Sequence, residues 1–358
     1  MDETLLSPAI ILLLGLAIGT VFGVVAHKTN FCAMGAVSDI INIQDWERMR
    51  MWWLAIGVAV TGVGLLQASG LVDLGASIYL ADQVSWLSHI VGGLCFGIGM
   101  SLASGCTTKT LIRMGGGNLK SIVVFVVLGV SAYATMKGLF GVWRVTWLDP
   151  FRLSFPQGQD LPALFAHHLS IGESLARWLV PLAVGAGLIL LAIGRPAARE
   201  KDVLVGGVGV GLMVIAAWFV TANIGFVAEH PETLEAAYIG TDLNRPESLS
   251  LVAPFANTLE LLMLWSDASL HLSFGVMIAA GIVLGSFLFA LLTGNLREES
   301  FPDAADLKRH LVGAALMGFG GITAPRPARS ARACRACRHW PSDRSSQPSR
   351  SSPGPQSP

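Results

Sequence analysis

Long runs of apolar residues recur along the chain and are separated by short polar segments. A membrane-spanning helix needs about 20 mostly apolar residues. Eight runs approach or reach that length: 6–26, 51–69, 86–104, 121–140, 173–193, 203–222, 272–293 and 310–324, the last being short for a span. The pattern therefore predicts an all-α, polytopic protein whose helices cross a lipid bilayer.

Two further apolar stretches do not fit a complete crossing. Residues 30–43 are too few and too polar, and residues 251–265 contain a proline and Glu260. Irregular or partial crossings are tolerated in membranes where other parts of the protein cover them. We therefore expect short re-entrant or interfacial helices beside the full spans.

Composition and charge agree with a membrane protein. The chain is 53% hydrophobic and 13% charged, whereas soluble domains carry about 25% charged residues. Basic residues flank the spans on one side, which predicts that this side is cytoplasmic and the N-terminus is outside. The formal net charge is zero, and no basic patch predicts a nucleic-acid partner.

One segment is repeated. "HIVGGLCFGIGMSLASGC" begins at His89, and "HLVGAALMGFGGITAPRP" begins at His310. Aligned at this offset, Gly92, Gly97 and Gly99 match Gly313, Gly318 and Gly320. We interpret residues 1–324 as one transmembrane domain built from two pseudo-two-fold repeats, approximately 1–140 and 203–324.

The repeat stops after Ala324, where an Arg-, Pro- and Ser-rich segment begins. We interpret residues 325–358 as a disordered tail translated out of frame. A shifted reading frame permits a cysteine codon across Pro327 and Ala328, at the position that matches Cys106. The same frame continues as a glycine-rich apolar segment.

The candidate chemistry lies where apolar segments break. Interrupted, repeated segments are typical of transporters, whose half-helix N-termini bind anions. In "SGCTTK", Gly105 permits a break, the hydroxyl groups that follow can cap a new helix, and unpaired N–H groups favour an anion. "NFCAMGA" around Cys32 has the same character. We therefore predict substrate contacts from Cys32, Cys106, Gly105, Thr107 and Lys109.

Other interpretations of these residues stay open. A cysteine in a membrane helix often acts as a small hydrophobic residue, and Lys109 can equally be a charge that anchors the helix end. The glycines at 115–117 lack the spacing of a phosphate-binding loop. The pair Cys334 and Cys337 with His339 lacks a fourth zinc ligand. The sequence thus predicts neither a cofactor nor a metal.

The motifs "NFCAMGA", "SGCTTKTLIRMGGGNLKS" and "GFGGITA" together resemble the YeeE/YedE family of sulfur-anion transporters. The resemblance implies a bacterial inner-membrane protein, not an enzyme, that takes up a sulfur-containing anion such as thiosulfate. It also implies three cysteines along the path: Cys32, Cys106 and a third at position 327. A soluble sulfur-carrier protein is a partner by analogy. Two alternatives remain, a sulfur-relay enzyme with a persulfide on Cys106 and a non-functional truncated transporter.

Overall fold

The computed structural model describes residues 8–75, 77, 83–154, 162–163, 165–166, 172–194, 200–229, 236–267 and 270–324, all within one compact unit. Its long helices are α1 (Pro8–Lys28), α3 (Glu47–Ala68), α4 (Trp86–Leu102), α6 (Leu119–Met136), α9 (Glu173–Ile193), α10 (Lys201–Phe219), α12 (Phe274–Thr293) and α13 (Ala304–Thr323). Shorter helices are α2 (Ala33–Ile43), α5 (Thr107–Gly115), α7 (Leu139–Trp147) and α11 (Val252–Met263), and a π-helical turn, η2 (Val220–Ile224), extends α10.

Strands are minor in the described part of the chain. β1 (Gln83–Val84) pairs antiparallel with β2 (Leu153–Ser154), and β3 (Phe226–Val227) pairs antiparallel with β4 (Ala237–Tyr238). Both pairs are only two residues long, so the core is made by helices. The predicted all-α class is confirmed.

Seven helical segments of the described residues are long and apolar enough to cross a membrane. They include every predicted run except 310–324, which forms the later part of α13. That helix begins at Ala304, and Asp306, Lys308 and Arg309 make its first turns polar. The predicted short segments are helices as well, α2 with 11 residues and α11 with 12. The protein is therefore a multi-pass membrane protein.

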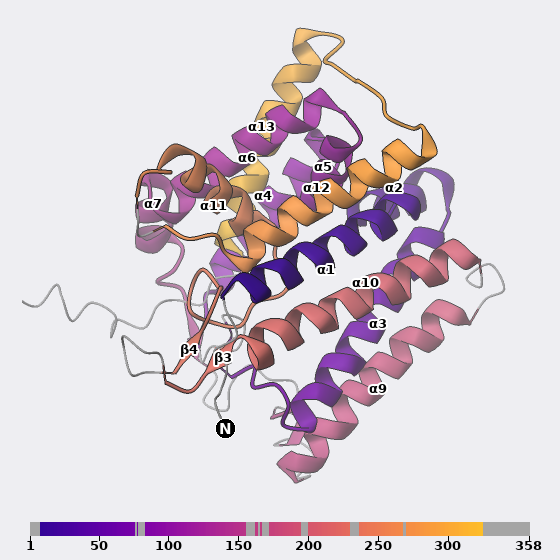
Figure 1. Cartoon of the computed structure of the whole chain (residues 1–358), viewed down its shortest axis with the longest axis vertical. Helices are drawn as coiled ribbons and strands as arrows, with labels where there is room; N and C mark the ends of the chain where they lie inside the picture. Colours follow the sequence, from indigo (N-terminus) through magenta and orange to yellow (C-terminus); the bar gives the residue numbers. More distant parts are fainter. Residues whose placement is uncertain are drawn as a thin grey trace, which may run out of the picture. The chain divides into compact units, whose positions relative to one another are not determined.

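The long helices pack in pairs, each of which joins an earlier and a later part of the chain. α1 packs along α12, α10 packs along α3, and α4 packs along α13. Figure 1 shows α12, α1 and α10 running side by side across the molecule. α6 covers another side of α13 and also contacts α11, while α9 lies on α3. Helices from the first half of the described chain thus pack against helices from the second half.

Glycines allow α4 and α13 to approach closely. A Cβ atom built on Gly99 would lie 2.7 Å from the carbonyl oxygen of Gly313, and one built on Gly313 would lie 2.8 Å from the carbonyl oxygen of Gly99. Gly92 meets Gly320 in a similar way. Any side chain at these positions would push the backbones apart. A pseudo-two-fold axis would generate this reciprocal pairing, because Gly92 and Gly99 align with Gly313 and Gly320.

Candidate functional site

Helices α1 and α4 end with the same backbone turn. Asn30 and Ser104 adopt left-handed conformations, with φ of 50° and 56°. The next residues, Phe31 and Gly105, donate their N–H groups to carbonyls five residues back, at 3.1 and 3.0 Å. Such a bond after a left-handed residue is a common helix stop. The sequence placed the sharp break at Gly105. The structure corrects this, because the strained residue is Ser104.

A short helix begins just after each stop, and a cysteine is its N-cap. Cys32 caps α2, with its sulfur accepting the N–H of Gly35 at 3.4 Å, and Cys106 stands at the N-cap of α5. No side chain caps α5, so the predicted hydroxyl cap is wrong. Thr107 is instead the first helical residue and is buried, while the Thr110 hydroxyl donates to the Cys106 carbonyl at 3.2 Å.

The starts of α2 and α5 meet at the two cysteines. The Sγ atoms of Cys32 and Cys106 lie 3.8 Å apart, and the two residues are 1% and 7% exposed. A helix carries partial positive charge at its N-terminus, from N–H groups that have no partner within the helix. Two such ends therefore converge on one pair of sulfur atoms. This environment favours negative charge beside the thiols.

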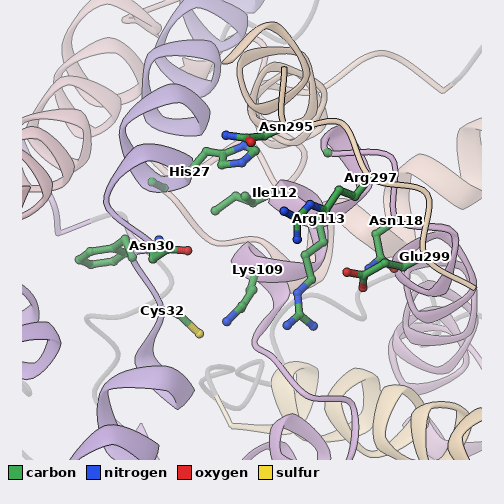
Figure 2. Close-up of a pocket in the computed structure, with 13 residues that line it drawn as sticks. His27, Asn30, Cys32, Lys109, Ile112, Arg113, Asn118, Asn295, Arg297 and Glu299 are labelled. Carbon is green, nitrogen blue, oxygen red and sulfur yellow. The ribbon is translucent and has the colours of Figure 1, made fainter. Parts of the chain in front are cut away.

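A pocket of roughly 360 Å³ adjoins the sulfur pair. Its lining residues are Ala26, His27, Asn30, Phe31, Cys32, Lys109, Ile112, Arg113, Gly116, Asn118, Asn295, Arg297 and Glu299. In Figure 2 the Lys109 amine and the Cys32 sulfur point toward one another across it. Of the predicted site residues, Cys32 and Lys109 line the pocket. Cys106, Gly105 and Thr107 do not, and Cys106 reaches it only through its neighbour Cys32.

The pocket has an excess of positive charge. Lys109, Arg113 and Arg297 contribute three cations, and Glu299 is the only carboxylate among the lining residues. The Glu299 carboxylate accepts a hydrogen bond from the Asn118 side chain at 2.6 Å, which offsets part of its negative charge locally. Grouped cations in a cleft attract anions from solution. The pocket is therefore suited to a small anion.

Sequence reasoning missed the wall formed by residues 295–299. This segment follows α12 and joins the start of α6 through the backbone: Arg297 N–H donates to the Gly116 carbonyl and Leu119 N–H to the Glu299 carbonyl, each at 3.1 Å. It carries no motif and is far in sequence from both cysteines. The sequence marked this segment in one way: Arg297 lies on the side of the membrane that is predicted to be basic.

Some predicted features cannot be placed. The expected third cysteine position, Pro327, and the whole segment 325–358 lie outside the described residues. Cys95 is described, and it sits within α4 without lining the pocket. The three described cysteines are free thiols.

Seven apolar helices define a multi-pass membrane protein, and the cationic pocket beside the paired thiols has the charge that suits a small anion. The chain belongs to the sulphur transport family, whose model matches residues 28–325. The resemblance predicted from the cysteine motifs is thus confirmed. Membership in this family also places the chain among transporters and not enzymes.

Two relatives share most of their length with this chain. It is 28% identical over 324 residues to the thiosulfate transporter TsuA of Escherichia coli (strain K12), covering 87% of this chain and 84% of that protein. It is 24% identical over 313 residues to the thiosulfate transporter TsuA of Spirochaeta thermophila, covering 87% of each.

Proposed function

We propose that this chain carries thiosulfate across the bacterial inner membrane, past the thiols of Cys32 and Cys106. The observation that carries the proposal is the sulfur pair, 3.8 Å apart, where two helix N-termini meet beside a cationic pocket. Support also comes from the sulphur transport family and from relatives named as thiosulfate transporters. The substrate is a soft anion, and the site offers soft, weakly polar sulfur contacts.

The chain's own residues lower the cost of moving a dianion through the membrane. Such an ion is strongly disfavoured in hydrocarbon. Lys109 supplies a charge beside Cys32, and the first N–H groups of α5, starting at Thr107, have no carbonyl partner within the helix. Gly105 leaves room for the Lys109 side chain, since a Cβ there would lie 3.3 Å from the Lys109 Cβ. Neutral thiols donate weak hydrogen bonds, which suits a site that must also release its ion.

Uptake by sulfur-starved cells tests this role of the thiols. Cys32→Ala and Cys106→Ala should each reduce ³⁵S-thiosulfate uptake to the level of cells without the protein, while Cys95→Ala should transport normally. Immunoblots of membranes would confirm equal amounts of protein. Normal uptake by both Cys32→Ala and Cys106→Ala would overturn the proposal.

A sulfur-relay enzyme with a persulfide on Cys106 is less well supported. Such a nucleophile is normally activated by an adjacent base, whereas the Cys106 sulfur faces the Cys32 thiol at 3.8 Å, and the matched family and relatives are transporters. A persulfide adds one sulfur atom, so mass spectrometry of the purified protein would show the Cys106 peptide about 32 Da heavier. Its absence after exposure to thiosulfate favours transport.

We also propose that residues 1–140 and 203–324 are two repeats and that residues 325–358 are out of frame. The reciprocal glycine contacts between α4 and α13 support the repeats, and the family match ends at residue 325. The measurement is uptake by this chain beside a frame-restored version, with the gene resequenced. Higher uptake by the restored version is expected, and an intact reading frame would refute the frameshift.

The resemblance further suggests a soluble sulfur-carrier protein that accepts the anion's sulfur on the cytoplasmic side. The basic pocket is on the side predicted to be cytoplasmic, so a partner would dock there. Affinity purification after crosslinking, repeated with Arg297→Glu, tests this. Recovery of the same carrier with both proteins would argue against docking at the pocket.

A further inference from the structure

His27 stands in the wall of the pocket and is used by none of the steps above. It belongs to the last turn of α1, and its ring is tilted at 51° against Phe289, with 5.1 Å between the ring centroids. Its Nδ1 lies 2.7 Å from the Ser286 hydroxyl oxygen, which in turn lies 2.6 Å from the Ile112 carbonyl oxygen. The imidazole is thus fixed on one side by a chain of two hydrogen bonds.

This chain of hydrogen bonds determines where the imidazole carries its hydrogen. A carbonyl oxygen can only accept, so the Ser286 hydroxyl must donate to Ile112. Having used its one hydrogen, Ser286 accepts from His27, whose Nδ1 therefore carries a hydrogen. In the neutral ring the other nitrogen, Nε2, is then a bare lone pair.

The free edge of the ring belongs to the pocket. His27 and Gly116 both line the pocket. The Cε1 atom of His27, which lies between the two ring nitrogens, would be 3.8 Å from a Cβ atom built on Gly116. Figure 2 shows the ring beside Asn295 at this wall. None of the hydrogen bonds found among the described residues involves Nε2.

The charged groups around the ring come from three segments. α5 contributes Lys109 and Arg113, the segment after α12 contributes Arg297 and Glu299, and α1 itself contributes the exposed Lys28. The Cys32 thiol, at the start of α2, is a further titratable group in the lining. The wall of α12 that touches the ring, Ser286 and Phe289, has no charge. Surrounding cations disfavour a second proton on His27 while the pocket is empty. A bound dianion reverses that balance.

We infer that His27 makes the pocket a proton-linked binding site for the sulfur oxyanion, so that one proton is taken up with each anion bound. A neutral ring would present its Nε2 lone pair to the anion and repel it. A ring protonated at Nε2 donates a charge-assisted hydrogen bond to an anion oxygen instead. Linkage then requires that anion binding raise proton affinity and that acid strengthen anion binding. This inference rests on the proposed function.

Calorimetry on the full-length protein in detergent can count the protons. Every lining residue precedes position 300, so binding of thiosulfate can be measured on the chain as it exists. Titrations in two buffers with different ionisation enthalpies should show about one proton taken up per anion near neutral pH, and about tenfold tighter binding per unit fall in pH. Thiosulfate itself stays a dianion over this range.

Variants separate the linkage from simple structural damage. His27→Arg, a permanent cation, should bind tightly with no proton uptake. In Ser286→Ala the imidazole loses the acceptor that fixes its hydrogen, so the neutral ring can donate from Nε2, and binding should persist with less proton uptake. His89→Gln alters a histidine that bonds to the Ser85 carbonyl away from the pocket and should keep the full linkage.

Two failures are distinguishable. Thiosulfate binding that is tight but independent of pH, with no buffer-dependent heat, would overturn the inference about His27 and leave the proposed function standing. No binding at any pH would overturn both. Unchanged proton uptake in His27→Arg would also refute the inference.

Discussion

Helices α4 and α13 carry the same glycine pattern, yet among the described residues only α13 has a helix seated on its second side. A Cβ on Gly318 of α13 would come within 2.8 Å of the Ala132 backbone nitrogen in α6. Its counterpart Gly97, on α4, has no described atom within 4 Å of such a Cβ. Ile90, Leu94 and Ile98 of α4 are more than half exposed. A glycine face in a membrane helix thus indicates that close packing is possible, and the partner decides whether it occurs.

The two halves also differ at the short helices. α2 begins after its N-cap residue Cys32, whereas α11, which follows α10 in the second half, begins after Leu251. Both are short and precede a long helix, α3 or α12. α11 is thus similar to α2 in length and in preceding a long helix, but it has no thiol at its start. The sulfur chemistry of the described residues is concentrated in the first half.

Oxidation of the sulfur pair should have the largest effect. Diamide, a two-electron oxidant, would take the two thiol hydrogens of Cys32 and Cys106 and leave an S–S bond, because the atoms start 3.8 Å apart. Thiosulfate uptake should fall to background and return after dithiothreitol. Peptide mapping without reductant checks the bond.

The controls for this experiment use the third described thiol. Cys95→Ser should respond to diamide as the parent protein does, since Cys95 does not line the pocket. Persistence of full uptake after complete crosslinking would show that the two sulfur atoms do not lie on the path.

A matched pair of glycine substitutions tests the packing contrast directly. Gly318→Val would force a side chain against the α6 backbone, and overpacking of this kind costs about 1–3 kcal/mol. Gly97→Val enters open space and should change stability by less than about 0.5 kcal/mol. Thermal melting in detergent measures both. Equal losses would mean that something outside the described residues covers Gly97.

The fold could be predicted from hydrophobic pattern because each span is long enough to be recognised alone. The site was predictable only where local chemistry marked it: the cysteines at 32 and 106 each follow a break that glycine and asparagine signal. Arg297 and His27 carry no such mark. Their position depends on how α12 packs beside α1 and α5, which is a tertiary fact.

An ion pair that joins the two halves offers a smaller test. Lys137, just after α6, contacts the Glu260 carboxylate of α11, and this hydrogen bond raises the pKa of Lys137. Glu260 is 7% exposed, so Lys137→Met leaves a buried carboxylate uncompensated. We expect the free energy of unfolding, measured by thermal melting in detergent, to fall by about 1 kcal/mol. The effect is no larger because solvent reaches half of the Lys137 side chain and weakens the pair.

The matched control is Lys120→Met, at the other end of α6. Lys120 pairs with Asp306 of α13 at 2.9 Å, and both side chains are partly exposed. Its removal should shift the melting temperature less. A larger shift for Lys120→Met would contradict the view that burial of the acid sets the cost.

A separate test is the pH dependence of stability that Glu247, in the loop before α11, should cause. Burial, with Asp242 nearby, raises the pKa of Glu247 from 4.5 to about 8, and its Oε1 has no hydrogen-bond partner among the described residues. The folded state thus holds a proton that the unfolded state releases near pH 4.5. This contribution to stability is complete below pH 4.5 and is lost as the pH rises through about 8.

The melting temperature of the parent protein should therefore fall between these two pH values, and that of Glu247→Gln should fall less. Glu229→Gln, at an exposed position, should keep the parent slope. A Glu247→Gln protein whose melting temperature falls as steeply as the parent's would show that other groups set the pH dependence of this half.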